Sequence, residues 1–164
     1  MGDSVRTIPL TKGLFAIVDD EDYQALSLHK WSATDCGNMT YALREENGRR
    51  IYMHRTILSP PPGSETDHVN MNGLDNRKCN LRVATRSQNN GNHARRRDSK
   101  SPYKGLHWDA VNLRWRATIR EGGKAKHLGR FSDPVEAALA YDLAALRVFG
   151  EFARPNFLRY QATD

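Results

Sequence analysis

The side chains best suited to chemistry in this chain lie between residues 67 and 89, where a carboxylate, an imidazole and two carboxamides follow one another. Asp67 and His68 are adjacent, and Asn80 and Asn89 come 12 and 21 residues after His68. Carboxylate and amide oxygens are ligands for hard divalent cations, and an imidazole can accept a proton from water near neutral pH. This spacing predicts a site that holds one divalent cation and activates a water beside it to cleave a phosphodiester bond.

Each of these four residues has a separate expected task. His68 is the expected general base, and Asp67 is the expected metal carboxylate, because neighbouring residues of a strand point to opposite faces. Asn80 can fix the tautomer of the imidazole through a hydrogen bond, and Asn89 can give its amide oxygen to the cation. Two oxygen donors favour Mg²⁺ or Mn²⁺ over softer metals.

The identity of the second metal ligand stays open between three neighbouring residues. Asn90 and His93 lie on the same expected helix as Asn89, and His93, four residues later, would share its face. Upstream of the site, His54 is expected to pack or to contact a phosphate, because one base suffices. For Arg82, a phosphate contact and simple solvation explain the sequence equally well.

Charge is distributed unevenly along the 164 residues. The chain carries 25 Lys and Arg against 19 Asp and Glu, a net charge of +6. Residues 95–130 contain eleven basic and three acidic residues, a net of +8, so the remainder has a net of −2. Such an asymmetry indicates a polyanionic partner bound by one region, and we expect that partner to be double-stranded DNA.

The composition also limits the cellular setting. Cys36 and Cys79 stand apart with no CxxC pair, so the sequence predicts neither a disulfide framework nor a structural zinc site. We find no apolar run of the ~18 residues that a membrane span requires and no signal-peptide pattern. We therefore expect a cytoplasmic protein with no membrane association.

The elements expected to position the first site are short strands around one helix. Residues 13–18 read as a strand, and the acids of residues 19–22 suit the start of a helix that runs towards His29. The Asn47-Gly48 pair predicts a tight hairpin between two further strands. Three prolines and a glycine at residues 60–63 then break the chain just before Asp67.

A second module follows a basic linker at residues 94–101. Apolar residues at 115, 117 and 119 alternate with Arg114, Arg116, Thr118 and Arg120, so one face of the expected strand is apolar and the other basic. A glycine pair turns this strand into a second one over residues 124–131. An alanine-rich helix then begins after Asp133 and ends near residue 149. Residues 158–164 form a tail.

The pattern Asp67-His68-x11-Asn80-Leu81-x7-Asn89 resembles the HNH endonuclease motif, in particular that of phage and intron-encoded homing endonucleases. The resemblance implies an α+β domain with the ββα-metal (His-Me finger) fold over residues 1–93. It also implies that His68 is the base, that Asn80 orients it, and that Asp67 and Asn89 bind the metal. The last motif residue is often histidine, and Asn89 instead matches an HNHN-type subgroup.

Residues 102–157 resemble the Apetala/ethylene-response-factor DNA-binding domain, a three-stranded antiparallel sheet packed on one helix. The matching motifs are Tyr103-Lys104-Gly105-Leu106, Trp115-Arg116-Ala117-Thr118-Ile119-Arg120, Leu128-Gly129-Arg130-Phe131, Glu136 to Asp142 and Pro155-Asn156-Phe157. The positions that match family DNA contacts are Lys104, His107, Thr118, Arg120 and His127. Alternation along the strand adds Arg114 and Arg116. Trp115 and Phe131 are expected in the core, and the role of Trp108 stays open.

Together these features predict a metal-dependent, site-preferring DNA endonuclease, a homing-type nickase encoded by a bacterium or phage. The alternative is a DNA-binding regulator whose nuclease-derived N-terminal domain is inactive. Because we see no second copy of the motif, one chain should cut one strand per binding event. The sequence leaves the oligomeric state and the target site open.

Overall fold

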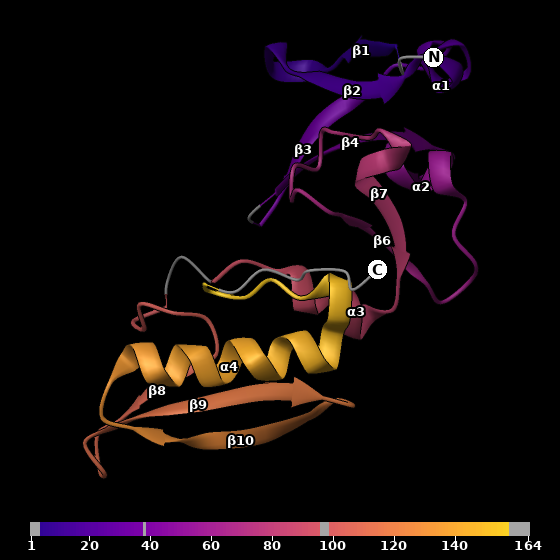
Figure 1. Ribbon diagram of the computed structural model, residues 1–164. Helices are drawn as coiled ribbons and strands as arrows, with labels where there is room; N and C mark the ends of the chain where they lie inside the picture. Colours follow the sequence, from indigo (N-terminus) through magenta and orange to yellow (C-terminus); the bar gives the residue numbers. More distant parts are fainter. Residues whose placement is uncertain (1–3, 38, 96–98, 158–164) are drawn as a thin grey trace. The chain divides into compact units, whose positions relative to one another are not determined.

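The computed structural model describes residues 4–37, 39–95 and 99–157. The chain divides into two compact units, residues 1–85 and residues 86–164, and each unit has its own sheets and helices (Figure 1). Residues 96–98 of the predicted linker and the predicted tail 158–164 lie outside the described residues.

The first unit combines short antiparallel sheets with two short α-helices. Its strands pair as β1–β2, β3–β4–β5 and β6–β7. In chain order its elements are β1 (Val5–Pro9), η1 (Thr11–Gly13), β2 (Phe15–Asp19), α1 (Asp20–Ser27), β3 (Ser32–Cys36), β4 (Met39–Glu46), β5 (Arg49–Tyr52), α2 (Met53–Leu58), β6 (Glu65–His68), η2 (Lys78–Asn80) and β7 (Leu81–Ala84).

The core of the first unit is built from strands and helices that lie between residues 8 and 53. Its buried members are Ile8, Ala16, Val18, Leu26, Trp31, Ala42 and Met53. Along β2 the buried residues alternate with more exposed ones, as expected for a strand with one face in the core. The indole of Trp31 is 3% exposed and donates to the carbonyl oxygen of Leu26 at 2.8 Å, which ties the end of α1 to this core.

The β4–β5 hairpin turns at the predicted residue pair. Asn47 and Gly48 have φ values of 51° and 72°, the left-handed conformation that two-residue hairpin turns require and that Asn and Gly tolerate best. The second strand is shorter than the sequence suggests, because β5 ends at Tyr52 and α2 begins at Met53. His54 therefore lies in the first turn of a helix.

The second unit is a three-stranded antiparallel sheet with a long helix packed on one face. Strand order is β10–β9–β8, and Figure 1 shows α4 lying along this sheet. Its elements are α3 (Arg86–Asn92), β8 (Leu106–Asp109), β9 (Arg114–Glu121), β10 (Lys124–Phe131), α4 (Pro134–Phe149) and η3 (Gly150–Phe152). The three-stranded sheet and single long helix that the sequence predicts for residues 102–157 are present.

Helix α4 begins and packs as its sequence predicts. The side chain of Asp133 accepts a hydrogen bond from the backbone N–H of Val135, and Pro134 occupies the first turn, where its missing N–H costs nothing. Four alanines of α4 are buried: Ala137, Ala138, Ala144 and Ala145. Their small side chains let the helix backbone lie close to the sheet.

The C-terminal segment is fastened to α4 by one buried carboxylate. Asp142 has no exposed surface and accepts hydrogen bonds from the backbone N–H groups of Asn156 and Phe157, each at 2.7 Å. The carboxamide of Asn156 also accepts from the backbone N–H of Lys104 at 2.8 Å. This network explains why the Pro155-Asn156-Phe157 segment belongs to the module.

Candidate active site and nucleic-acid interface

The candidate active site is centred on the β6–β7 hairpin. Asp67 and His68 are the last two residues of β6 and are 3% and 1% exposed. In the antiparallel register, Asp67 lies opposite Arg82 and His68 lies opposite Leu81. The structure thus places the adjacent carboxylate and imidazole on a buried strand.

The carboxylate of Asp67 is balanced by an arginine of the partner strand. The Nε and Nη2 atoms of Arg82 both lie 2.8 Å from Oδ2 of Asp67. A buried carboxylate is costly unless it is paired, so Arg82 lowers the cost of keeping Asp67 inside the unit. The guanidinium of Arg82 thus has a partner within the first unit.

Two aromatic rings from separate elements pack on the His68 imidazole. Tyr41 of β4 and His54 of α2 have ring centroids 5.7 Å and 5.0 Å from that of His68. Tyr52 of β5 lies behind them, with its centroid 5.4 Å from that of His54. The rings shield the imidazole from solvent on these sides.

Burial lowers the pKa of both His68 and His54. It is the main cause that lowers the pKa of His68, against which Asn76 and the carboxylates of Asp67 and Asp75 act. Burial together with His68 and Arg55 lowers the pKa of His54 to about 3. Burial also raises the pKa of the Tyr41 hydroxyl to about 12. The imidazole of His68 is therefore neutral near pH 7, the state in which it can accept a proton.

Asn80 fastens the loop that follows His68. It is 5% exposed, its Oδ1 accepts from the backbone N–H of Asn70 at 2.9 Å, and its Nδ2 donates to the carbonyl oxygen of Asp75 at 2.8 Å. The bond to the imidazole that the sequence suggests is not among its contacts. Asn80 therefore joins two points of the loop backbone, and its role in orienting the imidazole stays a prediction.

The same loop carries a second polar cluster that the sequence analysis did not single out. Asp75 is 2% exposed and accepts from Nε and Nη2 of Arg77 at 2.8 and 2.7 Å and from Nδ2 of Asn70 at 2.8 Å. The Arg77 guanidinium is the main cause that lowers the pKa of Asp75. Asn76 lies between these two residues with no exposed surface. Asp75 thus joins Asn70 and Arg77 within the loop.

The loop is also joined to β2 and α1 of the same unit. The backbone of Ile17 donates to Leu74 at 2.8 Å and accepts from Asn76 at 2.7 Å. The backbone N–H of Lys78 donates to the Asp19 carboxylate at 2.7 Å, and its ammonium pairs with Glu21. The acids expected only to begin α1 thus also hold the active-site loop, and the Asp19 carboxylate makes no cap bond to α1.

Gly73 allows the loop to lie directly on β4. A Cβ atom at this position would come within 2.5 Å of the carbonyl oxygen of Thr40 and 2.8 Å of the ring of Tyr41. The same Tyr41 ring packs on His68. A side chain at Gly73 would therefore push on a ring that shapes the histidine site.

The other proposed metal ligands lie on or next to α3. Asn89 and Asn90 are on this helix, and His93 is one residue past its end. Helix α3 belongs to the second unit, where the backbone carbonyl oxygen of Gly91 accepts hydrogen bonds from the N–H of Arg154 and the ammonium of Lys104. The role of Asn89 as a metal ligand stays a prediction.

The second unit presents a basic face on the side of its sheet opposite α4. The predicted alternation is present: Arg114, Arg116 and Arg120 of β9 are exposed, whereas Ala117 and Ile119 between them are buried. Opposed residues of antiparallel strands share a face, so His107 and Arg130, which both lie opposite Arg116, extend this face across all three strands. Thr118 and His127 form the next row on the same face.

Arg130 was not singled out by the sequence pattern, because its position depends on an irregularity in β10. The register shifts between His127 and Gly129, which places Arg130 on the basic face. Its Nε donates to the Asp109 carboxylate at 2.9 Å. Bonds from Asn112 and Arg130 lower the pKa of Asp109 to about 2.

The ammonium of Lys104, a predicted DNA contact, is bonded to backbone carbonyl oxygens of the second unit. Its ammonium donates to the carbonyl oxygens of Gly91 at 2.7 Å and of Arg154 at 3.4 Å. Burial lowers the pKa of Lys104 to about 8. These contacts tie α3 to the C-terminal segment, and the DNA contact of Lys104 stays a prediction.

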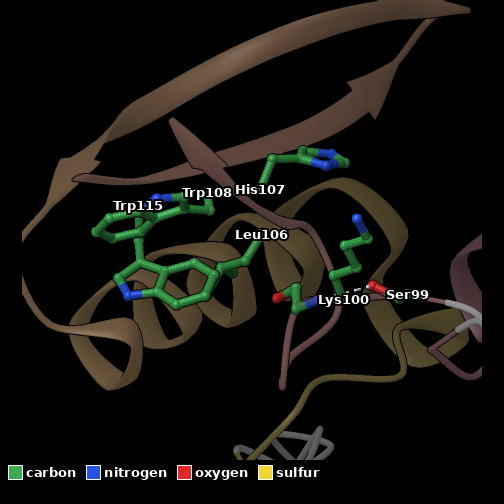
Figure 2. A pocket seen from close by; sticks show the side chains of 7 residues that line it. Ser99, Lys100, Leu106, His107, Trp108 and Trp115 are labelled. Atoms are coloured by element: carbon green, nitrogen blue, oxygen red, sulfur yellow. Dashed lines mark hydrogen bonds between the residues drawn. The ribbon is translucent and has the colours of Figure 1, made fainter. Parts of the chain in front are cut away.

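Trp108 and Trp115 form one end of a pocket beside β8. Trp108 is 50% exposed, and the two indole centroids are 5.1 Å apart in an edge-to-face contact. Figure 2 shows the two indoles side by side, with Lys100 at the other end of the pocket. Trp115 and Phe131 are half-buried, and Trp108 lies at the surface.

Within the residues that the structure describes, no helix is long and apolar enough to cross a membrane. The same residues contain no cluster of three or more His, Cys, Asp and Glu side chains arranged to hold a metal ion.

The chain is similar to two viral proteins over most of its length. It is 30% identical to an uncharacterised HNH endonuclease of Acanthamoeba polyphaga mimivirus over 88% of this chain and 76% of that protein. It is 32% identical to protein 3.8 of Escherichia phage T7 over 65% of this chain and 88% of that protein.

A shorter match involves a plant protein. A stretch of 45 residues is 53% identical to the dehydration-responsive element-binding protein 2C of Arabidopsis thaliana, which corresponds to 26% of this chain and 13% of that protein. No protein-family model matches the chain, and no solved structure is significantly similar to it. The mimivirus relative is 30% identical to this chain, and the match covers most of its length. The chain therefore belongs to the HNH endonuclease family.

Proposed function

We propose that this chain is a metal-dependent, site-preferring DNA endonuclease of the homing type, which hydrolyses one phosphodiester bond per binding event. The observation that carries this proposal is the pair of buried residues Asp67 and His68 at the end of β6. The pair stands in a chain of the HNH endonuclease family, and its loop is fixed by Asn80.

His68 acts as the general base in this proposal. Its burial lowers the pKa of the imidazole, so the ring is neutral near pH 7 and can take the proton of the attacking water as the new P–O bond forms. The bond to the leaving 3′ oxygen then breaks. Asn80 keeps the loop, and through it the imidazole, in one orientation, which reduces the reorganisation required during the reaction.

The carboxylate of Asp67 fits a hard divalent cation, Mg²⁺ or Mn²⁺, because it is an oxygen donor held in a buried position. When bound, such a cation would stabilise the negative charge on the phosphate and on the leaving oxygen. Asn89 is the second proposed ligand, from the sequence motif. Arg82 balances the carboxylate in the absence of a cation.

The second unit is proposed to bind double-stranded DNA through the basic face of β8–β9–β10. Arg114, Arg116 and Arg120 are exposed in a row along β9, and His107 and His127 lie on the same face. Strands can enter the major groove and contact base edges. The match to a plant protein named for element binding supports this assignment, and the viral relatives fit a phage-encoded or virus-encoded enzyme.

One observation favours a second candidate, a DNA-binding regulator with an inactive nuclease unit. The Asp67 carboxylate is paired with Arg82, and the His68 imidazole is 1% exposed, so both groups are shielded from solvent. An active enzyme must open this site when DNA binds, whereas a regulator need not.

The deciding experiment is relaxation of a supercoiled plasmid by the full chain. We expect nicking with Mg²⁺ or Mn²⁺ and none in EDTA, and a loss of roughly 10²–10⁴-fold for His68→Ala with DNA affinity unchanged. His29→Ala, at an exposed histidine of the same unit, is the matched control. Full activity in EDTA would contradict the proposed metal requirement, and wild-type turnover by His68→Ala would contradict its role as general base. DNA binding by the wild type without any cutting would favour the regulator.

A further inference from the structure

Helix α4 is apolar on two sides, although the sheet covers only one of them. Val135, Leu139 and Leu143 recur every four residues and are 39%, 38% and 64% exposed. Residues four apart lie on one face of a helix, so these three side chains form a stripe on α4. The face that packs on the sheet is made instead by alanines and Tyr141.

This stripe has no role in the functions proposed for the second unit. The basic residues of β9 lie on the opposite face of the sheet from α4, so the stripe does not contribute to the proposed DNA interface. Single exposed leucines are common on protein surfaces. These three aligned side chains instead form one contiguous apolar patch, a kind of surface that can bind a partner.

Two charged residues beside the stripe determine which partner fits it. Glu136 lies in the first turn of α4 and Arg147 in the last turn, and at 100° per residue they fall on the same flank of the stripe. Both are exposed, and within the described residues neither forms an ion pair. In an antiparallel pair of identical helices, equivalent flanks face each other, so Glu136 of each copy would meet Arg147 of the other.

We propose that α4 pairs antiparallel with α4 of a second copy of this chain about a two-fold axis. Leu139 of each copy then opposes Leu143 of the other, and two Glu136–Arg147 pairs close the ends. Such an interface is isologous, with the same patch used by both copies. It leaves both basic sheet faces free for DNA.

The size of the stripe sets the expected strength of this dimer. Three apolar side chains and two ion pairs form an interface well below the roughly 1,200 Å² of stable complexes, so the free dimer is weak. Two copies bound to neighbouring sites on one DNA would associate more strongly, because the second contact becomes intramolecular. The proposal does not depend on catalysis and can be tested without it.

Sedimentation equilibrium of the full chain across a wide concentration range tests the proposal. We expect the mass to rise from monomer to dimer, and Leu143→Lys to shift this transition at least tenfold to higher concentration. Val111→Lys, at a 91% exposed apolar residue outside α4, is the matched control and should dimerise as the wild type does. Circular dichroism establishes that each variant is folded.

Charge reversal separates the proposed pairing from a general effect on the helix. Glu136→Arg and Arg147→Glu should each weaken the dimer, and the double reversal should restore it, because the partners are again opposite in sign. If the charges act only on helix stability, the two losses add instead. A monomer at all concentrations, or a dimer insensitive to Leu143→Lys, overturns the proposal. A lower free energy of unfolding for Leu143→Lys, with no change in dimerisation, also overturns it. That result would mean that the stripe is covered within one chain.

Discussion

Replacing Asn80 with alanine should loosen the active-site loop by an amount that its hydrogen bonds allow us to estimate. The change leaves the N–H of Asn70 and the carbonyl oxygen of Asp75 without their partner in a region where Asn80 itself is 5% exposed. A buried polar group without a partner costs about 1–3 kcal/mol. We therefore expect the free energy of unfolding of the first unit to fall by about 2–4 kcal/mol.

Asn70→Ala is the matched comparison, because it removes the same side chain from the same loop at an exposed position. The Asn70 carboxamide donates to Asp75 at 2.8 Å and accepts from the N–H of Asn72 at 2.8 Å. Water can replace the bond to the exposed Asn72, and the buried Asp75 carboxylate keeps both of its bonds from Arg77, so the expected loss is below about 1 kcal/mol. Burial, rather than the number of hydrogen bonds, thus predicts which of the two variants loses more free energy of unfolding.

Hydrogen–deuterium exchange of the peptide that covers residues 69–80, measured across urea concentrations, reports on this loop directly. Asn80→Ala should exchange faster in this peptide and shift its unfolding to lower urea, with plasmid nicking reduced and DNA affinity retained. Equal stability losses for the two variants would refute the reasoning from burial. A loss of nicking by Asn80→Ala with unchanged exchange would instead favour direct contact between Asn80 and the reaction.

Three further expectations concern pH, salt and strand cutting. Because burial lowers the pKa of His54 to about 3 and an unfolded histidine titrates near about 6.5, the unfolded chain binds more protons between these values. The free energy of unfolding should therefore fall as the pH drops below about 6.5, by up to about 1.4 kcal/mol per pH unit, and His54→Phe should remove this part of the slope in urea titrations. In anisotropy titrations the slope of log K for DNA binding against log salt concentration should be near −4 to −5 if about five phosphates are neutralised. Replacement of Arg114, Arg116 and Arg120 by alanine should reduce the magnitude of this slope by about 2–3. An unchanged slope would mean that DNA binds to another surface. On supercoiled plasmid at low enzyme concentration, open-circular DNA should accumulate before linear DNA, and linear product without this intermediate would mean that two active sites cut together.

The sequence predicts the elements of this chain well wherever neighbouring residues determine them. The Asn47-Gly48 turn, the alternation along β9 and the Asp133 cap of α4 each depend on residues a few positions apart. The short helix α2 was missed, because its six residues continue directly from β5 without a capping hydrogen bond. Local patterns carry little information about a helix that tertiary packing stabilises.

The roles of individual site residues were harder to predict, because they depend on partners that are distant in sequence. The sequence motif identifies Asn80, but only the structure shows that it bonds the loop backbone rather than the imidazole. Lys104 matches a DNA-contact position, yet its ammonium bonds carbonyl oxygens 13 and 50 residues away. A basic residue in a basic segment gives no signal for such an inward role.

The active-site loop shows most clearly why a motif does not reveal the whole site. Its backbone is joined to Ile17, and its Lys78 is bonded to Asp19, 59 residues earlier in the chain. These contacts make β2 part of the support for the loop that follows His68, although this strand does not belong to the motif. Substitutions far from the histidine, such as Asp19→Ala, should therefore affect cutting through the loop, whereas the proposed DNA face on β9 should be unaffected.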